Sequence, residues 1–265
     1  MKSPAIALGM FALVSPAFAV DERYRAYEPA PGLAGTVEAA ADPANARLML
    51  LWREGFAARH PAARIAPLDA AASDALTARA AVEALAVFVH RDNPLSCLPL
   101  DGLATLFAGA ATWGDAGLEG DWAARPVVVF DRPAGSERDF FAAAALKGGE
   151  IAPDAKIIAR ASALMREIGV VPGGIGYAPA GYRSDAVRAL KLSDGGECAG
   201  PSEANAHRAA WPLARIVRLV ARGPAARNMI DYVLSQEGQR DAVIAGYFAL
   251  PYVFAAEDRK ALGLD

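Results

Sequence analysis

The stretch ALAVFVHRDNP, residues 84–94, is an apolar run that ends abruptly in charged and turn-forming residues. Its central part, from Leu85 to Val89, predicts a strand that is buried on both faces. The residues from His90 to Pro94 then end this strand. A strand of this kind belongs in a sheet that helices cover, which is the arrangement of α/β proteins.

Outward from this stretch, strand-like and helical patterns alternate along the chain. Strands are predicted at residues 32–37, 125–130, 173–177, 187–192 and 216–220, and helices at residues 44–59, 100–108, 137–146, 161–168 and 225–245. The first helix has Leu48, Trp52 and Phe56 on one face, and Asp42 followed by Pro43 is a strong helix-start signal. The alternation predicts an α/β fold with parallel or mixed sheets.

The first 19 residues have the pattern of a secretory leader. Lys2 is followed by an apolar run from Ala5 to Val14 and by a small-x-small sequence that ends at Ala19. The alternative is an ordinary buried N-terminal helix. We expect cleavage after Ala19 and export to the periplasm, and no later run is long and apolar enough to predict a membrane span.

Net charge limits the classes of possible partner, and the two cysteines allow one disulfide. Without Lys2, the chain has 26 basic against 30 acidic side chains, a formal charge of −4. This mild acidity argues against nucleic acid and anionic membrane as partners. Cys97 and Cys198 could form a disulfide in an oxidising compartment, and the sequence leaves open whether the two sulfurs meet.

The sequence offers little catalytic chemistry. It contains neither a Gly-x-Ser-x-Gly nucleophile motif nor a Walker phosphate loop. The histidines His60, His90 and His207 are far apart and have no metal-type spacing. We therefore predict a protein that is not an enzyme and has no cofactor and no metal.

Several segments, taken in order, resemble the phosphate-binding proteins of high-affinity phosphate ABC transporters. They are residues 84–94 with 100–107 and 112–114, GSERDFF (135–141), GGIGY (173–177), WPLAR (211–215), YVLSQEGQ (232–239) and AGYFALP (245–251). The resemblance implies a two-lobed periplasmic-binding-protein fold of type II with hinge strands. It also implies that phosphate or a related oxyanion binds between the lobes of a monomeric receptor, which delivers it to an ABC permease.

The same resemblance implies a division of the chain into lobes. We expect one lobe from residues 20–89 and 212–265, and the other from residues 90–211. The strands that cross between them are expected near residues 87–93 and 212–217.

The resemblance places anion-binding residues at the start of two helices. In the second lobe they are Arg132, Gly135, Ser136, Glu137 and Arg138. In the first lobe they are Asp42 and Asn45, although Asp42 would cap the helix itself and add negative charge. A solvated helix N-terminus, with Ser136 as the cap and Glu137 in the first turn, is the alternative to a ligand site at residues 132–138.

These positions depart from the family pattern, in which the corresponding loops carry Ser and Thr hydroxyls. Glu137 stands in place of a threonine, and the span 65–81 is too short for a further phosphate-contacting loop. Two functions therefore remain open. The protein either binds phosphate or a related oxyanion for an ABC importer, or is a degenerate relative in the cell envelope with another ligand or an accessory role.

Overall fold

The computed structural model describes residues 20–42, 45–68 and 74–265. Its strands are β1 (Gly35–Asp42), β2 (Ala63–Pro67), β3 (Leu76–His90), β4 (Cys97–Pro99), β5 (Val128–Asp131), β6 (Lys156–Ile157), β7 (Gly174–Pro179), β8 (Val187–Ala189), β9 (Lys191–Ser193) and β10 (Ala214–Arg222). Its α-helices are α1 (Ala46–Arg59), α2 (Leu100–Phe107), α3 (Ser136–Ala145), α4 (Ala161–Val170), α5 (Glu203–His207), α6 (Ala226–Val233), α7 (Gln236–Ala245) and α8 (Tyr252–Ala261). Short 3-10 helices, Trp113–Ala116 and Gly120–Trp122, follow α2. The predicted leader, residues 1–19, lies outside the described residues.

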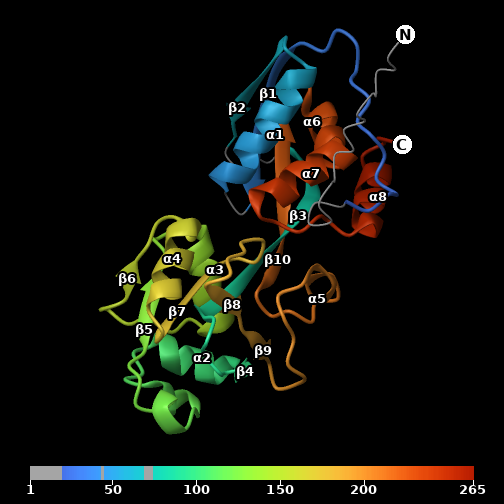
Figure 1. Cartoon of the computed structure of the whole chain (residues 1–265). Coiled ribbons are helices and arrows are strands. Elements are labelled where there is room, and N and C mark those ends of the chain that lie inside the picture. The colour runs from blue at the N-terminus through green and yellow to red at the C-terminus, as the bar shows by residue number, and fades with distance from the viewer. Residues whose placement is uncertain (1–19, 43–44, 69–73) are drawn as a thin grey trace, which may run out of the picture.

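The long strand β3 passes through both lobes of the molecule (Figure 1). Its first part, from Leu76 to Ala84, pairs antiparallel with β10. Its second part, from Leu85 onward, pairs antiparallel with β7 and β8. The apolar part of the stretch ALAVFVHRDNP, from Leu85 to Val89, therefore belongs to the half of β3 that enters the second lobe.

The main sheet is mixed rather than parallel. Its strand order is β2-β1-β10-β3-β7-β5-β6, and β8 also pairs with β3. The β1–β2, β5–β7 and β5–β6 pairs are parallel, whereas β10 runs antiparallel to both β1 and β3. The α/β class with a mixed sheet agrees with the prediction.

Separate hydrophobic cores form in the two lobes. The first packs Trp52 and Phe56 of α1 against residues of α6, α7 and the adjacent strands. The second packs Phe107, Phe141 and Tyr177 between α2, α3 and β7. The cores divide along β3, where Ala81 belongs to the first and Ala84 to the second. The predicted domain boundaries, after residues 89 and 211, lie near the end of β3 and just before β10, and they remain predictions.

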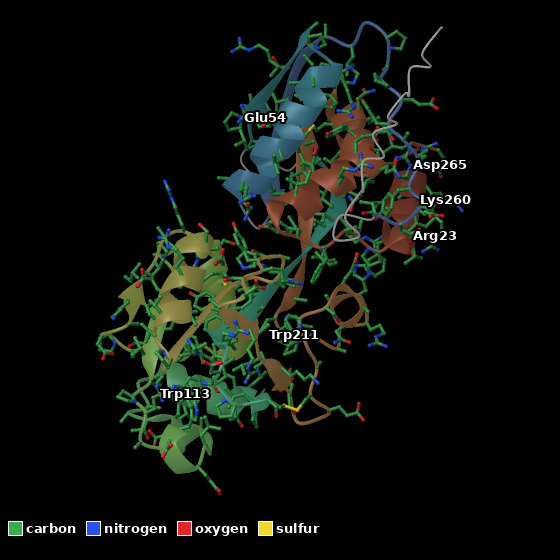
Figure 2. All side chains as sticks on the ribbon, viewed as in Figure 1. Arg23, Glu54, Trp113, Trp211, Lys260 and Asp265 are labelled. Atoms are coloured by element: carbon green, nitrogen blue, oxygen red, sulfur yellow. A yellow bond between two sulfur atoms is a disulfide. The ribbon has the colours of Figure 1, made fainter. Side chains whose placement is uncertain are left out.

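Trp211 and Trp113 are buried, one beside the strands that cross between the lobes and the other inside the second lobe. Trp211 lies beside the strands that join the lobes, and its indole N–H donates to the carbonyl oxygen of Leu85 at 2.8 Å (Figure 2). Trp113 lies within the second lobe, and its indole N–H donates to the carbonyl oxygen of Gly173 at 3.1 Å. Both side chains thus combine large apolar burial with a satisfied N–H.

The start of the first helix differs from the prediction. Asp42 is the last residue of β1 and is exposed, so it does not cap the helix. The cap is Asn45, whose side-chain oxygen accepts a hydrogen bond from the backbone N–H of Leu48 at 3.0 Å. Asn is as good an N-cap as Asp. Asp42, which the sequence pattern assigned to the start of the helix, belongs to strand β1 instead. Pro43 lies outside the described residues.

Cys97 and Cys198 form a disulfide in this structure. Cys97 begins β4, which pairs in parallel with β9, and Cys198 lies a few residues beyond β9. The bridge closes a loop across 101 positions of sequence. It ties the region before α5 back to the start of the second lobe.

Within the ranges that the structure describes, every helix is too short or too polar to cross a bilayer.

Candidate functional site

The N-terminus of α3 lies beside the crossing strand β10, where the lobes meet. Gly135, the N-cap of α3, has a φ of 146°, in the region that favours glycine. Glycine has no side chain to cap the first-turn N–H groups, so these groups and the positive end of the helix dipole form a suitable place for an anion. Because Gly135 is the cap and Ser136 the first helical residue, the predicted capping role of Ser136 is wrong, whereas Glu137 does lie in the first turn.

Arg215 of β10 bonds directly to the first residue of α3. Its Nη2 donates to the hydroxyl oxygen of Ser136 at 2.8 Å and to the carbonyl oxygen of the same residue at 3.1 Å. Its guanidinium also lies over the ring of Phe140, 4.3 Å from the centroid. Two contacts on α3 thus fix the position of this arginine.

Glu83 of β3 holds the other side of Arg215. Its side chain is only 4% exposed, and its Oε2 accepts a hydrogen bond from Nε of Arg215 at 2.5 Å. Burial raises the pKa of the Glu83 carboxyl, and the charge of Arg215 opposes this shift without cancelling it. The buried hydroxyl of Tyr247 also lies close to Glu83, and burial likewise raises the pKa of that phenol.

A second arginine–carboxylate pair lies within the loop and helix. Nε of Arg132 donates to Oε1 of Glu137 at 2.7 Å, and Nη1 of Arg132 donates to the carbonyl oxygen of Ile158 at 2.9 Å. Their side chains are 13% and 21% exposed, respectively. Glu137 thus occupies a donor of Arg132 that an oxyanion could otherwise use.

The third pair fixes the loop that precedes α3. Asp131, at the end of β5, is 3% exposed. It accepts hydrogen bonds from the backbone N–H of Arg132 at 2.7 Å, from the hydroxyl of Tyr177 at 2.7 Å and from Nε of Arg138 at 2.8 Å. Burial and the Asp131 carboxylate together raise the pKa of Tyr177, which keeps its proton as a donor. These bonds give Asp131 and Arg138 a positioning role.

The three arginines of this cluster are therefore each paired with a carboxylate of the same chain. An oxyanion at α3 would first meet the Ser136 hydroxyl and the first-turn backbone N–H groups, which no side chain of the described residues caps. An oxyanion that also contacted Arg132 or Arg215 would share that guanidinium with Glu137 or Glu83. Because the site is partly buried, a change in the charged partners of either arginine has a large effect on the free energy of anion binding.

The fold brings together only part of the residue set predicted from the sequence. Arg132, Gly135, Ser136, Glu137 and Arg138 form one cluster around the start of α3. Asp42 and Asn45 lie in the other lobe, at the end of β1 and at the start of α1. Asn45 also lines an apolar groove of about 420 Å³ with Met49 and Leu50 of α1 and residues of β1 and β2.

The start of α1 nevertheless approaches the second lobe. Arg47 donates from Nη1 to the hydroxyl of Tyr182 at 3.0 Å, and Tyr182 lies in the loop after β7. Nη2 of Arg47 donates to the carbonyl oxygen of Ile244, which is in α7. Figure 1 shows this end of α1 facing the second lobe.

Sequence reasoning missed Glu83, Arg215, Asp131, Tyr177 and Tyr247. Glu83 did leave a signal, since it is the only charged residue in the apolar run from residue 80 to residue 89. A buried carboxylate in such a run needs a partner, which points to a basic residue on a neighbouring strand. Arg215 gave no comparable signal, because its pairing with Glu83 depends on the register between β3 and β10.

Comparison with known proteins gives two kinds of relative. No family model matches the chain. The sequence is 27% identical to the phosphate-binding protein PstS of two Pseudomonas aeruginosa strains, over 299 aligned positions that cover 93% of this chain and 93% of each relative. The similarity thus extends over nearly the whole length of both proteins.

Solved structures share the fold at lower sequence identity. A possible phosphate binding protein from Planctomyces limnophilus superposes with a TM-score of 0.66 at 16% identity, covering 82% of this chain and 93% of that one. An ABC-type phosphate transport receptor from Vibrio cholerae gives 0.64 at 18% identity, covering 77% and 96%. PstS from Borrelia burgdorferi gives 0.58 at 12% identity, covering 77% and 94%. This chain is thus similar in sequence to PstS, and it shares its two-lobed fold with solved phosphate-binding proteins.

Proposed function

We propose that this protein is the substrate-binding protein of a phosphate-type ABC transporter, and that it holds phosphate or a related oxyanion between its lobes. The observation that carries the proposal is similarity to a phosphate-binding protein over 93% of the chain. The start of α3 supports it, because the Ser136 hydroxyl and Arg132 lie together there with first-turn N–H groups that the N-cap Gly135 has no side chain to cap. The similar proteins are named as binding proteins and transport receptors, not enzymes.

The proposed cycle uses the crossing strands as a hinge. An oxyanion accepted at α3 would draw residues of the first lobe toward it, and the two lobes would close around it. The receptor would then deliver the anion to a membrane permease. Residues 1–19 would act as the export leader, cut after Ala19, which places the protein in the periplasm.

Calorimetric titration of phosphate and, separately, sulfate into the purified protein tests the proposal. We expect saturable phosphate binding in the micromolar range or tighter, at one site per chain. Arg132→Ala should weaken it at least about tenfold, since a charge-assisted hydrogen bond to the anion is lost. The matched control is Arg91→Ala, because Arg91 is 63% exposed just after the end of β3.

Thermal melts of both variants would show whether they are folded. A folded wild-type protein that gives no heat with millimolar phosphate or sulfate would contradict the proposal. It would support the alternative, a degenerate relative with another ligand or an accessory role. Equal affinities in wild type and Arg132→Ala would show that the anion does not contact Arg132.

A further inference from the structure

The ion pair between Glu83 and Arg215 lies directly behind the proposed anion site. Arg215 joins the two lobes because it is on β10 and bonds to Ser136 on α3. Glu83 is on the neighbouring crossing strand β3 and bonds to the same guanidinium. This single arginine is thus shared between a buried carboxylate and the first residue of the helix that is proposed to receive the anion.

The direction of the hydrogen bond to Ser136 is informative. A guanidinium can only donate, so Nη2 of Arg215 uses a lone pair of the Ser136 hydroxyl oxygen. The hydroxyl hydrogen of Ser136 is then left to donate to another acceptor. Arg215 therefore holds this hydroxyl as a donor at the helix N-terminus, where an oxyanion needs donors.

The charge of Arg215 is offset by Glu83. Their Nε and Oε2 atoms are 2.5 Å apart, and the Glu83 side chain is 4% exposed, so water screens the pair weakly. With Glu83 ionised, the pair presents almost no net charge to the start of α3. With Glu83 neutral, the positive charge of Arg215 acts on that position without compensation.

We propose that Arg215 positions Ser136 and supplies positive charge for an oxyanion at the start of α3, and that Glu83 limits this affinity by pairing with Arg215. The proposal rests on the proposed function, and it assigns the tuning of that site to two residues of the hinge strands. Other groups that face Glu83 are the Tyr247 hydroxyl and the Glu137 carboxylate. Glu137 is itself paired with Arg132, which leaves Arg215 as the cation bonded to Glu83.

Phosphate titrations of Glu83→Gln and Arg215→Gln test the proposal. Glu83→Gln keeps the shape and removes the negative charge, so it should bind phosphate on the order of tenfold more tightly. Arg215→Gln should bind about tenfold more weakly. Arg215→Lys should fall between wild type and Arg215→Gln, because it keeps the charge and loses the fork geometry.

Glu38 and Arg222 provide the matched controls. They form an ion pair between β1 and β10, with side chains 36% and 40% exposed, at the far end of the same sheet. Glu38→Gln and Arg222→Gln make the same charge changes, and Arg222 is on the same strand as Arg215. Both controls should leave the phosphate dissociation constant unchanged.

The pH profile separates a tuning role from a purely structural one. The ratio of the wild-type to the Glu83→Gln dissociation constant should rise with pH as Glu83 ionises, and should approach one at low pH. Titration of phosphate itself cancels in this ratio. A flat ratio, or a Glu83→Gln protein that binds no more tightly than wild type, would overturn the proposal.

Failure of this inference and failure of the proposed function give different results. If wild type binds phosphate and the Glu83 and Arg215 variants match it, only the inference is wrong. If wild type gives no heat and Glu83→Gln binds, the inference is supported and the native protein is not a phosphate receptor. If neither protein binds phosphate or sulfate, both are overturned.

Discussion

At the scale of single residues, buried or partly buried carboxylates pair with the arginines around the start of α3. Asp131 is the clearest structural case, because three donors converge on it: a backbone N–H, the Tyr177 hydroxyl and Nε of Arg138. Asp131 is almost completely buried, so each of these donors depends on it.

Asp131→Asn should lower the free energy of unfolding by about 2–3 kcal/mol. The asparagine amide can still accept two of the bonds on one oxygen, but its NH₂ group would face the donor of Arg138. Urea denaturation monitored by circular dichroism would measure the change. The control is Asp101→Asn, whose exposed partner is Lys147, and it should leave the denaturation midpoint unchanged. Equal midpoints for both variants would contradict the positioning role of Asp131.

Glu83 makes stability depend on pH in a direction that can be stated. Burial raises its pKa above the ordinary value of 4.5, so the folded protein binds this proton more tightly than the unfolded chain does. The stability that this bound proton contributes is fully present below pH 4.5, and it is lost as the pH rises through the pKa of Glu83 in the folded state. Wild type should therefore lose stability relative to Glu83→Gln over that interval.

Urea denaturation of the two proteins at a series of pH values would measure this difference. The difference in unfolding free energy should shift in favour of Glu83→Gln with increasing pH and then become constant. A difference that is independent of pH would show that the Glu83 pKa is the same in the folded and unfolded states.

At the scale of elements, apolar spacing at helical periodicity predicted several helices well. The helices expected at 100–108 and 161–168 are α2 and α4 with small changes at their ends. The helix expected at 225–245 is instead two helices, because Ser235 caps a new helix, accepting a hydrogen bond from the N–H of Gly238 at 3.3 Å. Its apolar spacing continues through the break, so periodicity alone could not reveal it.

Ser235→Ala should lower the unfolding free energy by about 1–2 kcal/mol. The serine is buried and also donates to the carbonyl oxygen of Tyr232 at 2.6 Å, so the substitution removes a cap and leaves that acceptor without this donor. Thermal denaturation would measure the loss. Ser202→Ala is the comparison, since Ser202 caps only the short helix α5 and should matter less. A larger loss for Ser202→Ala would contradict this ranking.

The candidate site was predictable from the sequence only where its residues are close together in the chain. Residues 132–138 form one loop and helix start, so the predicted residues within it are close in space because they are close in sequence, and their ligand-binding role stays a prediction. Glu83 and Arg215 are separated by more than 130 positions and meet through strand pairing. The start of α1 was misplaced because Asp-Pro is a strong local signal, whereas β1 extends to Asp42 through its pairing with β10.

At the scale of the whole molecule, the two lobes have separate cores and share β3 and β10. The disulfide between Cys97 and Cys198 lies entirely in the second lobe and should stabilise that lobe. Its removal in a Cys97→Ser, Cys198→Ser double variant should lower the unfolding free energy by about 2–4 kcal/mol, because the bridge closes a loop across 101 positions.

Denaturant titrations of the oxidised protein, the reduced protein and the double variant would measure this. Reduced wild type and the double variant should have matching midpoints, both below that of the oxidised protein. An oxidised protein no more stable than the double variant would contradict the expected contribution of the bridge.

The proposed function requires an oxyanion to bind at the start of α3, between the lobes. Hydrogen–deuterium exchange with and without saturating phosphate would show where on the chain the anion binds. We expect slower exchange at the first-turn N–H groups of α3, residues 136–138, together with slower exchange where β3 and β10 cross between the lobes. Unchanged exchange at α3, with protection elsewhere or nowhere, would contradict it.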